Sequence, residues 1–279
     1  MGIVTGLFRR AARRLALLPL QALGADTRAE ALERLSSEAV TRAPIAGGEL
    51  AFYAPTPLLR SRAATLLSKE PDTIAWLDGL TDRDVLWDVG ANVGAYSLYA
   101  AARARCAVLA FEPSAPNFFV LTRNIQLNHL SDRVTAYCVA LSGATGLGAI
   151  NLDSAELGTA MSQFGHVGEA SRYSTHANPL WHGMVGFTVD DFIEKFDAAC
   201  PTHLKLDVDG LELPILQGAR DTLSDARLRS AMVEISLTHE SERHASLQLM
   251  RDCGFTLASQ GAVQGMAGEQ AANHLFVKA

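Results

Sequence analysis

The chain contains an apolar run that leads into a glycine-rich turn, Val85-Leu86-Trp87-Asp88-Val89-Gly90-Ala91-Asn92-Val93-Gly94-Ala95-Tyr96-Ser97. This pattern predicts a buried strand, a tight turn and a helix, because glycine adopts backbone conformations closed to other residues and lets a ligand approach the backbone. Asp88, at the end of the strand, can accept hydrogen bonds from an amine. A dinucleotide-binding turn needs a second glycine to admit the pyrophosphate, and Asn92 stands at that position instead.

Short apolar runs and helical segments alternate through the rest of the chain. The expected strands cover residues 85–87, 107–111, 134–140, 203–206, 231–235, 256–259 and 274–277, and the expected helices cover residues 95–103, 117–127, 189–196, 211–223 and 241–253. Alternation of this kind predicts an α/β fold in which helices cover both faces of a mostly parallel sheet. Ligands of such sheets bind beyond the carboxyl ends of the strands.

The same pattern divides the chain into two expected domains. Residues 1–80 are a helical prelude that can include a short strand at 48–53, with helices at 57–67 and 70–77. Residues 81–279 form the ligand-binding domain. Residues 143–186 break the rhythm with Gly, Ser and His, and we expect a loop insertion there, which in a compact domain is usually functional or mobile.

Composition narrows the class of protein. Among the 279 residues 48% are hydrophobic and 19% are charged, which suffices for an apolar core without disulfide or metal staples. The 24 basic and 30 acidic residues leave a net charge of −6, so no general nucleic-acid binding is expected. No apolar run reaches the roughly 20 residues of a membrane span. Four widely spaced cysteines favour free thiols in a reducing, cytoplasmic compartment, and no zinc site is expected.

A second strand ends in Leu109-Ala110-Phe111-Glu112-Pro113-Ser114, which places Glu112 20 residues after Asn92. A carboxylate at this distance from the glycine turn can bind both hydroxyls of a ribose. A ribose site without a pyrophosphate site, together with Asp88 for an amine, indicates S-adenosylmethionine. Two alternatives remain: Asp88 and Glu112 can simply cap the adjacent helices, or the protein can be a nicotinamide-dependent oxidoreductase.

Several segments of the chain resemble the FkbM family of S-adenosylmethionine-dependent methyltransferases. They are the glycine turn, Phe111-Glu112-Pro113, residues 124–128, Thr188-Val189-Asp190-Asp191-Phe192, Leu204-Lys205-Leu206-Asp207-Val208-Asp209-Gly210-Leu211-Glu212, Leu216-Gln217-Gly218-Ala219 and Val233-Glu234-Ile235. The resemblance spans about residues 70–235. The family often has Glu where this chain has Asp209.

The resemblance implies a Rossmann-like class I methyltransferase fold with a seven-stranded, mostly parallel sheet and one antiparallel strand. It also implies transfer of a methyl group to a hydroxyl oxygen of a sugar, glycan or secondary metabolite. The cofactor-binding residues carried over from it are Asp88, Gly90, Ala91, Asn92 and Gly94 for the methionine part, Glu112, Pro113, Ser114 and Asn117 around the ribose, Ala140 and Leu141 beside the adenine, and Asp207 near the methyl group.

Candidate catalytic residues follow the fourth and fifth strands. Asp207 is expected to face the cofactor and the acceptor, because it stands at the carboxyl end of a strand, and Asp209 or Glu212 would orient the substrate or take its proton. Lys205 and His239 complete the candidate catalytic set. In the alternative interpretation, Lys205 and Asp207 form an ion pair and Glu212 is a helix-start carboxylate. A divalent ion on this cluster is a weaker alternative, because no further ligand has suitable spacing.

Two other regions could contact the acceptor substrate or a membrane. In the insertion, His166, His176 and His182 are further candidate bases, and Tyr173 and Trp181 could stack on a sugar ring. The arginine-rich segment 1–23 could form a basic amphipathic helix at a membrane surface, although packing or disorder is the simpler expectation. A catalytically inactive cofactor-binding or membrane-associated scaffold is therefore a third hypothesis.

Overall fold

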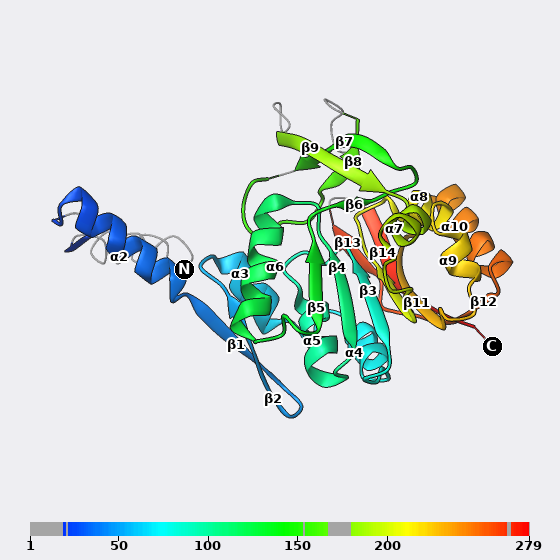
Figure 1. Cartoon of the computed structure of the whole chain (residues 1–279), viewed down its shortest axis with the longest axis horizontal. Coiled ribbons are helices and arrows are strands. Elements are labelled where there is room, and N and C mark those ends of the chain that lie inside the picture. Colours follow the sequence, from blue (N-terminus) through cyan, green and yellow to red (C-terminus); the bar gives the residue numbers. More distant parts are fainter. Residues whose placement is uncertain (1–18, 21, 153, 167–179, 267–268, 279) are drawn as a thin grey trace, which may run out of the picture. The chain divides into compact units, whose positions relative to one another are not determined.

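The computed structural model describes residues 19–20, 22–152, 154–166, 180–266 and 269–278 (Figure 1). They belong to two compact units that divide between Val40 and Thr41. The first unit contains helix α2 (Ala25–Ser37), which buries none of its residues. The expected basic helix at 1–23 lies almost entirely outside the described residues. Among the residues that are described, no helix is long and apolar enough to cross a membrane.

The second unit is built on a central sheet whose strands run in the order β12-β14-β11-β10-β3-β4-β5, with β13 paired to β14. The strands are β3 (Val85–Val89), β4 (Ala107–Phe111), β5 (Val134–Tyr137), β10 (His203–Leu206), β11 (Ser230–Ser236), β12 (Phe255–Gln260), β13 (Gln264–Met266) and β14 (Glu269–Lys278). The five strands from β11 to β5 are parallel, and β14 is antiparallel to both of its long neighbours. This order confirms the predicted Rossmann-like fold with one antiparallel strand.

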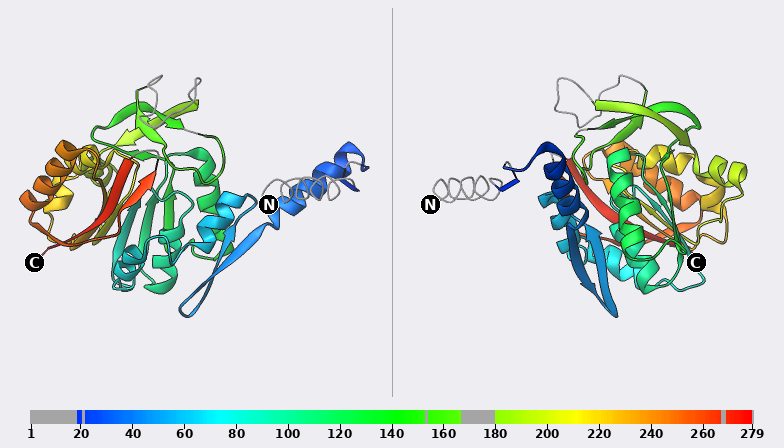
Figure 2. Two further views of the ribbon diagram at one scale, coloured as in Figure 1. Left: turned by 180° about the vertical axis from the view of Figure 1, so that it is seen from behind. Right: turned by 60° about the vertical axis from the view of Figure 1, so that its left-hand side comes forward.

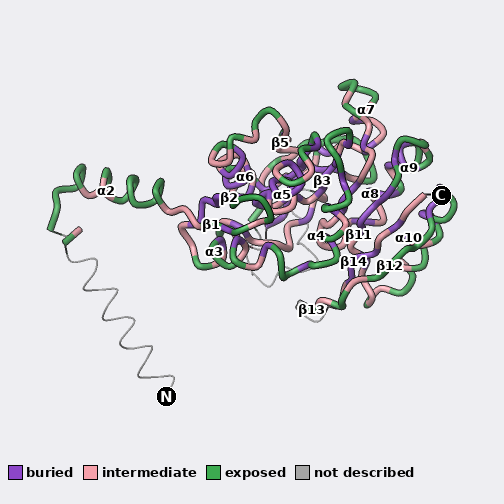
Figure 3. The backbone as a smooth tube through the Cα atoms, turned by 90° about the horizontal axis from the view of Figure 1, so that it is seen from below, coloured by how far each residue is buried: buried purple, intermediate pink, exposed green. Residues whose placement is uncertain are grey.

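Helices cover both faces of this sheet because its strands bury alternate residues on opposite sides. Leu86 and Val108 pack in one core with α4 (Pro71–Leu77), α5 (Ala95–Arg103) and α6 (Ala115–Leu127). Trp87 and Leu109 pack in the other core with α7 (Val189–Phe196), α8 (Glu212–Gln217), α9 (Arg220–Ser224) and α10 (Glu240–Asp252). Figures 2 and 3 show the two helical layers and the buried strands between them.

The strands β1 (Val40–Ile45) and β2 (Gly48–Tyr53) form a separate two-stranded sheet, followed by α3 (Pro57–Ala64). Side chains of α6 hold β2: Asn124 Oδ1 accepts the Tyr53 N–H at 2.7 Å, and Asn128 Oδ1 accepts the Ala51 N–H at 2.8 Å. The strand and the helices after it are therefore part of the same compact unit as the central sheet. The boundary expected after residue 80 falls instead at Val40, because these amides tie the prelude to α6.

The expected loop at 143–186 differs most from the structure. It contributes β7 (Gly146–Leu152), β8 (Gln163–Gly165) and β9 (Leu180–Phe187) to a second sheet of order β6-β9-β7-β8. The short strand β6 (Ala140–Leu141) is its fourth member, so the expected third strand of the central sheet ends at Tyr137. Gly148 and Gly186 lie against the Phe164 ring, where an added Cβ would come within 2.7 and 2.6 Å of ring carbons. These glycines make room for an aromatic side chain within a sheet, whereas the Gly, Ser and His content of residues 143–186 suggested a loop.

Candidate functional site

A cavity of about 510 Å³ lies at the carboxyl ends of the central strands, a size typical of small-molecule sites. Its floor comes from the segments that follow β3, β4, β10 and β11. Residues of α3 and the turn after it, of the segment 159–164, and of β13 and β14 complete its walls. The cavity therefore occupies the position at which doubly wound sheets bind ligands, as the sequence predicted.

The glycine turn between β3 and α5 passes directly under the segment that follows β10. Gly90 has a φ of +82°, and a Cβ added there would lie 1.8 Å from the carbonyl oxygen of Asp207. At Gly94, where φ is +83°, a Cβ would lie 2.4 Å from a methyl carbon of Leu121. Both positions thus require glycine for two reasons, the left-handed backbone and the close approach. Asn92 also adopts a left-handed conformation, with a φ of +50°.

Glu112 occupies the end of β4 as predicted and lines the cavity. One carboxylate oxygen accepts the N–H of Asn92 and the other accepts the N–H of Ser114, both at 2.8 Å. Burial raises the pKa of Glu112 to about 7, against the opposing effect of these two hydrogen bonds. The Asn117 side chain also hydrogen-bonds this carboxylate. A carboxylate has about four acceptor positions, so Glu112 keeps capacity for a ligand hydroxyl group.

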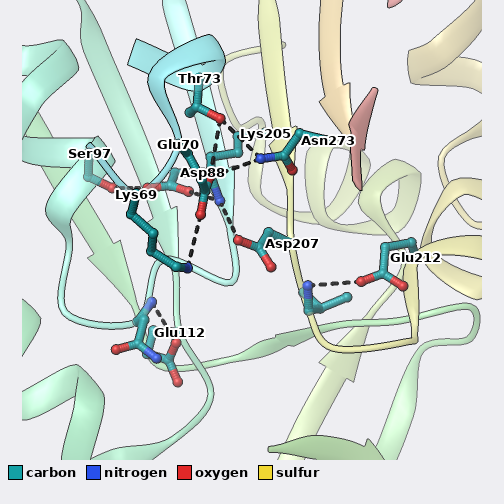
Figure 4. Close-up of polar contacts among 12 residues, drawn as sticks. Lys69, Glu70, Thr73, Asp88, Ser97, Glu112, Lys205, Asp207, Glu212 and Asn273 are labelled. Atoms are coloured by element: carbon teal, nitrogen blue, oxygen red, sulfur yellow. Dashed lines mark hydrogen bonds and ion pairs between the residues drawn. The ribbon is translucent and has the colours of Figure 1, made fainter. Parts of the chain in front are cut away.

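Lys205 is the centre of a buried charge cluster beneath the cavity (Figure 4). The parallel register pairs Lys205 with Asp88 on the next strand, so their side chains share one face of the sheet. Lys205 Nζ lies 3.1 Å from Asp207 Oδ2 and 3.8 Å from Asp88 Oδ1. Burial alone would lower the pKa of Lys205, but the charges of Asp207 and Asp88 raise it above its usual value. The predicted ion pair between Lys205 and Asp207 is therefore present.

Asp88 is placed differently from the prediction that it binds the cofactor amine. It is not among the residues that line the cavity, and Ser97 Oγ donates to its Oδ2 at 2.5 Å. Its other oxygen, Oδ1, is buried without a hydrogen bond in the described structure and lies 3.8 Å from the ammonium of Lys205. Burial raises the pKa of Asp88. In this arrangement Asp88 fixes Lys205, which in turn fixes Asp207.

Glu234 also lines the cavity, although it was not among the site residues predicted from the sequence. The register of β10 with β11 pairs Leu206 with Val233, which brings the next residues, Asp207 and Glu234, level with each other. The negative charge of Asp207 and burial raise the pKa of Glu234 to about 9, and Glu234 hydrogen-bonds Asp207. The pKa of Asp207 is shifted in the opposite direction: burial would raise it, but the positive charge of Lys205 lowers it below its usual value. One carboxyl group of the pair is thus ionised and the other protonated at neutral pH.

Asp209 and Glu212 line the cavity but are occupied by backbone groups. Asp209, with a φ of +56°, accepts the N–H of Met161 at 2.6 Å, and burial raises its pKa to about 6. Glu212 accepts the N–H groups of Val208 and Gly210, each at 3.1 Å, and burial raises its pKa to about 7. Glu212 therefore has the helix-start role that was the alternative prediction, and Asp209 holds the segment before β8 over the cavity.

Comparison with known proteins decides the family. Residues 88–257 match the Methyltransferase FkbM domain, a segment that covers more than half of the chain. The chain belongs to the FkbM methyltransferase family. This confirms the resemblance predicted from the sequence.

A curated relative of this FkbM protein is the hexuronic acid methyltransferase AglP of Haloferax volcanii, 30% identical over 170 residues. The match covers 61% of this chain and 63% of the relative. Among solved structures, methyltransferase FkbM of Methylobacillus flagellatus matches with a TM-score of 0.45 at 17% identity, over 78% of this chain and 53% of that one. Magnesium protoporphyrin IX methyltransferase of Synechocystis, solved with bound SAM, matches with a TM-score of 0.48 at 11% identity, over 81% and 86%.

The other residues predicted from the FkbM resemblance divide into two groups. Those that line the cavity are Gly90, Ala91, Asn92, Pro113, Ala140 and Leu141. Those that do not are Gly94, Ser114, Asn117 and His239. Asn117 instead anchors the segment over the cavity: its Oδ1 accepts the N–H of Gly158, and its Nδ2 donates to the carbonyl of Thr159 at 2.9 Å. His239 is the N-cap residue of α10.

The histidines and aromatic residues expected to cover the acceptor are not cavity residues where they are described. His166, His182 and Trp181 lie outside the cavity lining, and Trp181 is exposed on β9. His176 and Tyr173 fall outside the described residues. Within the described ranges, no group of three or more His, Cys, Asp or Glu side chains is arranged to hold a metal ion.

Two cavity residues, Arg62 and Lys69, precede the FkbM domain match and were not predicted. They come from α3 and the turn that follows it. Their seven-residue spacing is helical, but it resembles many solvated helix faces and gives no functional signal by itself. Only the packing of this segment over the carboxyl end of the sheet brings them to the site.

Proposed function

We propose that this protein is an S-adenosylmethionine-dependent O-methyltransferase that acts on a hydroxyl group of a sugar, glycan or secondary metabolite. The observation that carries the proposal is Glu112, a cavity carboxylate at the end of β4 that retains acceptor capacity for a ligand hydroxyl group beside its bonds to Asn92, Ser114 and Asn117. Family membership supports methyl transfer, and the name of the relative from Haloferax volcanii supports a sugar acceptor.

The chemistry of the cavity fits the cofactor. Glu112 would bind the ribose, and Gly90, which packs against the backbone of Asp207, lines the cavity beside it. Asn92 Oδ1 is buried and accepts no hydrogen bond in the described structure, so it has capacity for an ammonium group. Asp207, which stays ionised, lines the cavity and favours a ligand with positive charge. Ala140 and Leu141 would contact the adenine.

When bound, S-adenosylmethionine supplies a methyl group activated by the sulfonium. The chain supplies alignment and a site for the proton of the acceptor hydroxyl. Asp207 is the candidate acceptor for that proton, because it lines the cavity and stays ionised beside Lys205. Glu234 supports it by donating a hydrogen bond. Asp209 and Glu212 hold the surrounding backbone, which argues for a positioning role for both.

The two alternative functions have weaker support. A nicotinamide dinucleotide would have to pass its pyrophosphate close to position 92, where the Asn92 side chain donates to the carbonyl of Thr159 at 2.9 Å. Membership of the methyltransferase family favours methyl transfer over a catalytically inactive scaffold. The membrane-binding form of that scaffold depends on residues 1–23, most of which lie outside the described chain.

Calorimetry with S-adenosylmethionine tests the proposal on the full chain. Glu112→Gln keeps the shape of the side chain but removes its charge, and we expect it to weaken binding about 10- to 100-fold. Glu194→Gln, an exposed change on α7, is the matched control and should bind normally. A mass-spectrometric screen of hydroxylated sugars and metabolites then tests turnover. Absence of cofactor binding by the wild-type protein would reject the proposed function.

A further inference from the structure

The cavity contains positive charge that the cofactor site leaves unexplained. Three cations line it: Lys205, which is paired with Asp88 and Asp207, and the two unassigned residues Arg62 and Lys69. Burying a guanidinium costs free energy unless hydrogen bonds and opposite charge compensate it. The contacts of Arg62 therefore indicate what kind of group it is placed to bind.

Arg62 makes one hydrogen bond in the described structure. Its Nε donates to the carbonyl oxygen of Gly158 at 2.6 Å, and no described residue accepts from its terminal amino groups. Burial lowers the pKa of Arg62, while the charges of Asp207, Asp209 and Glu112 raise it. None of these carboxylates hydrogen-bonds the guanidinium. The side chain is thus held through Nε, with its planar pair of terminal donors available in the cavity.

An available pair of guanidinium donors matches a carboxylate, which can accept two parallel hydrogen bonds from it. Lys69 adds a second positive charge on the same wall: its Nζ lies 3.0 Å from Glu70, and half of its side chain is exposed. In a cavity lined by five carboxyl groups, these two cations define the place where an anionic part of a ligand is tolerated. Neutral sugars would leave them unused.

The cofactor has a carboxylate of its own, but the structure offers another partner for it. The N-cap of α5 is Gly94, which provides no side-chain cap, so the first N–H groups of this nine-residue helix remain available. Ala95 and Tyr96, in its first turn, line the cavity. An uncapped helix N-terminus suits the methionine carboxylate. Arg62 then remains for the acceptor.

We propose that Arg62 binds a carboxylate of the acceptor, with Lys69 adding to the positive potential, so that the substrate is a sugar acid and not a neutral sugar. This inference rests on the proposed function, because it concerns the acceptor of the same site. In that substrate the carboxylate positions the ring, and a hydroxyl group lies toward Asp207.

Binding of two sugars that differ only at one carbon tests the proposal. Methyl β-D-glucuronide and methyl β-D-glucoside are titrated by calorimetry into the full chain in the presence of S-adenosylhomocysteine. We expect the wild-type protein to prefer the glucuronide by about 10- to 100-fold and Arg62→Gln to abolish the preference. Arg62→Lys should restore part of it. Arg60→Gln, an exposed change on the same helix, should leave it intact.

A second titration distinguishes the acceptor carboxylate from that of the cofactor. S-adenosylmethionine and its decarboxylated analogue should show the same affinity ratio in wild-type protein and in Arg62→Gln. A ratio that collapses in the variant would assign Arg62 to the cofactor and overturn the proposal. Equal binding of the two sugars by the wild-type protein, or no binding of the glucuronide, would also overturn it.

The outcome for Arg62 can be separated from that for the proposed function. A wild-type protein that binds S-adenosylmethionine but shows no Arg62-dependent preference retains the function and refutes the sugar acid. A protein that does not bind the cofactor refutes the function, and titration of the sugars alone then decides the role of Arg62. Gln at position 62 can still donate to the Gly158 carbonyl. If that variant unfolds, Arg62→Lys decides, because loss of the planar fork should reduce the preference at least several-fold.

Discussion

Two buried carboxylates at opposite ends of β3 illustrate how the two ends of the sheet differ. Asp84 precedes the strand and is 3% exposed, whereas Asp88 lies near its carboxyl end and is 1% exposed. Asp84 accepts from the N–H and hydroxyl of Thr81 at 2.7 and 2.9 Å, and from Thr202 and Arg229. Hydrogen bonds from these neighbouring side chains and from the backbone use the acceptor capacity of the Asp84 carboxylate, and its role is structural.

Asp88 belongs to a cluster that local groups do not satisfy fully. One of its oxygens lacks a hydrogen bond, and Lys205 must serve both Asp88 and Asp207. Residues with left-handed backbone gather at the same end of the sheet, among them Gly90, Asn92 and Asp209. Strain and incomplete pairing together are typical of a site that awaits a ligand. Burial of a charge by itself therefore does not identify a site, whereas the incomplete pairing of Asp88 occurs next to Lys205 and Asp207, which line the cavity.

The largest effect on stability is expected from removing the cation at the carboxyl end of the sheet. Lys205→Met leaves Asp88 and Asp207 buried without their counter-ion, and we expect the free energy of unfolding to fall by about 3 to 5 kcal/mol. Arg229→Met is the matched change at the other end, where 55% of the side chain is exposed, and should cost at most about 1 kcal/mol. Urea denaturation of both variants measures the difference. Equal losses would contradict the contrast between the two ends.

A smaller loss of stability without loss of binding is expected at Asp84. Asp84→Ala leaves the N–H and the hydroxyl of Thr81 without their acceptor, and should lower the free energy of unfolding by about 2 to 3 kcal/mol. Asp84 does not line the cavity, so the affinity of the folded variant for S-adenosylmethionine should be unchanged. Denaturation and calorimetry on the same preparation test both statements. A weakened affinity in the folded variant would show that the two ends are coupled.

Glu234→Gln should stabilise the protein at alkaline pH. Because the pKa of Glu234 is raised to about 9 in the folded state, its contribution to stability is complete below the ordinary pKa of a glutamate and is lost as the pH rises through 9. Glutamine stays neutral, so the wild type should lose stability relative to the variant as the pH rises from 5 to 9, and at pH 9 the Tm of the variant should be higher by at least several degrees. At pH 5 the two should melt alike.

Melting curves at pH 5, 7 and 9 measure this difference, with Glu240→Gln, an exposed change on α10, as the control. A wild-type protein whose Tm relative to Glu234→Gln does not depend on pH would contradict the protonated state assigned to Glu234. The pH dependence also measures how strongly the negative charge of Asp207 opposes ionisation of Glu234 at the carboxyl end of the sheet.

The features that the sequence predicted are those encoded locally. An apolar run before Asp88, Gly90 and Gly94 specifies a strand, a turn and a helix whatever the rest of the chain does, and the strand-end position of Glu112 follows from the same pattern. The register that brings Glu234 level with Asp207 depends on pairing between distant segments. Glu234 could have been predicted as a site residue from the segment Val233-Glu234-Ile235, because the carboxyl ends of parallel strands lie at the same edge of a sheet.

Other features depend on tertiary contacts that leave no local pattern. Gly148 and Gly186 resemble loop residues until the Phe164 ring is seen against them. Arg62 resembles any charged residue of an amphipathic helix until α3 packs over the sheet. Asp88 was predicted to contact the cofactor, because its position at the strand end is visible in the sequence, whereas the hydroxyl of Ser97 and the ammonium of Lys205 that enclose it are not.

The smallest expected effect is a pH dependence of cofactor affinity that comes from Glu112. Burial raises its pKa to about 7, and a ribose or a cation is bound best by its ionised form. The Kd for S-adenosylmethionine should therefore be about 10-fold higher at pH 6 than at pH 8, a difference of about 1.4 kcal/mol. Glu112→Gln should remove most of this dependence, whereas Glu212→Gln should retain it, because Glu212 is occupied by the N–H groups of Val208 and Gly210. If Glu212→Gln removed the pH dependence instead, Glu212 and not Glu112 would be the group whose ionisation changes the affinity for the cofactor. The pH dependence would then come from the carboxylate that holds the turn after β10 and not from a contact with the ribose.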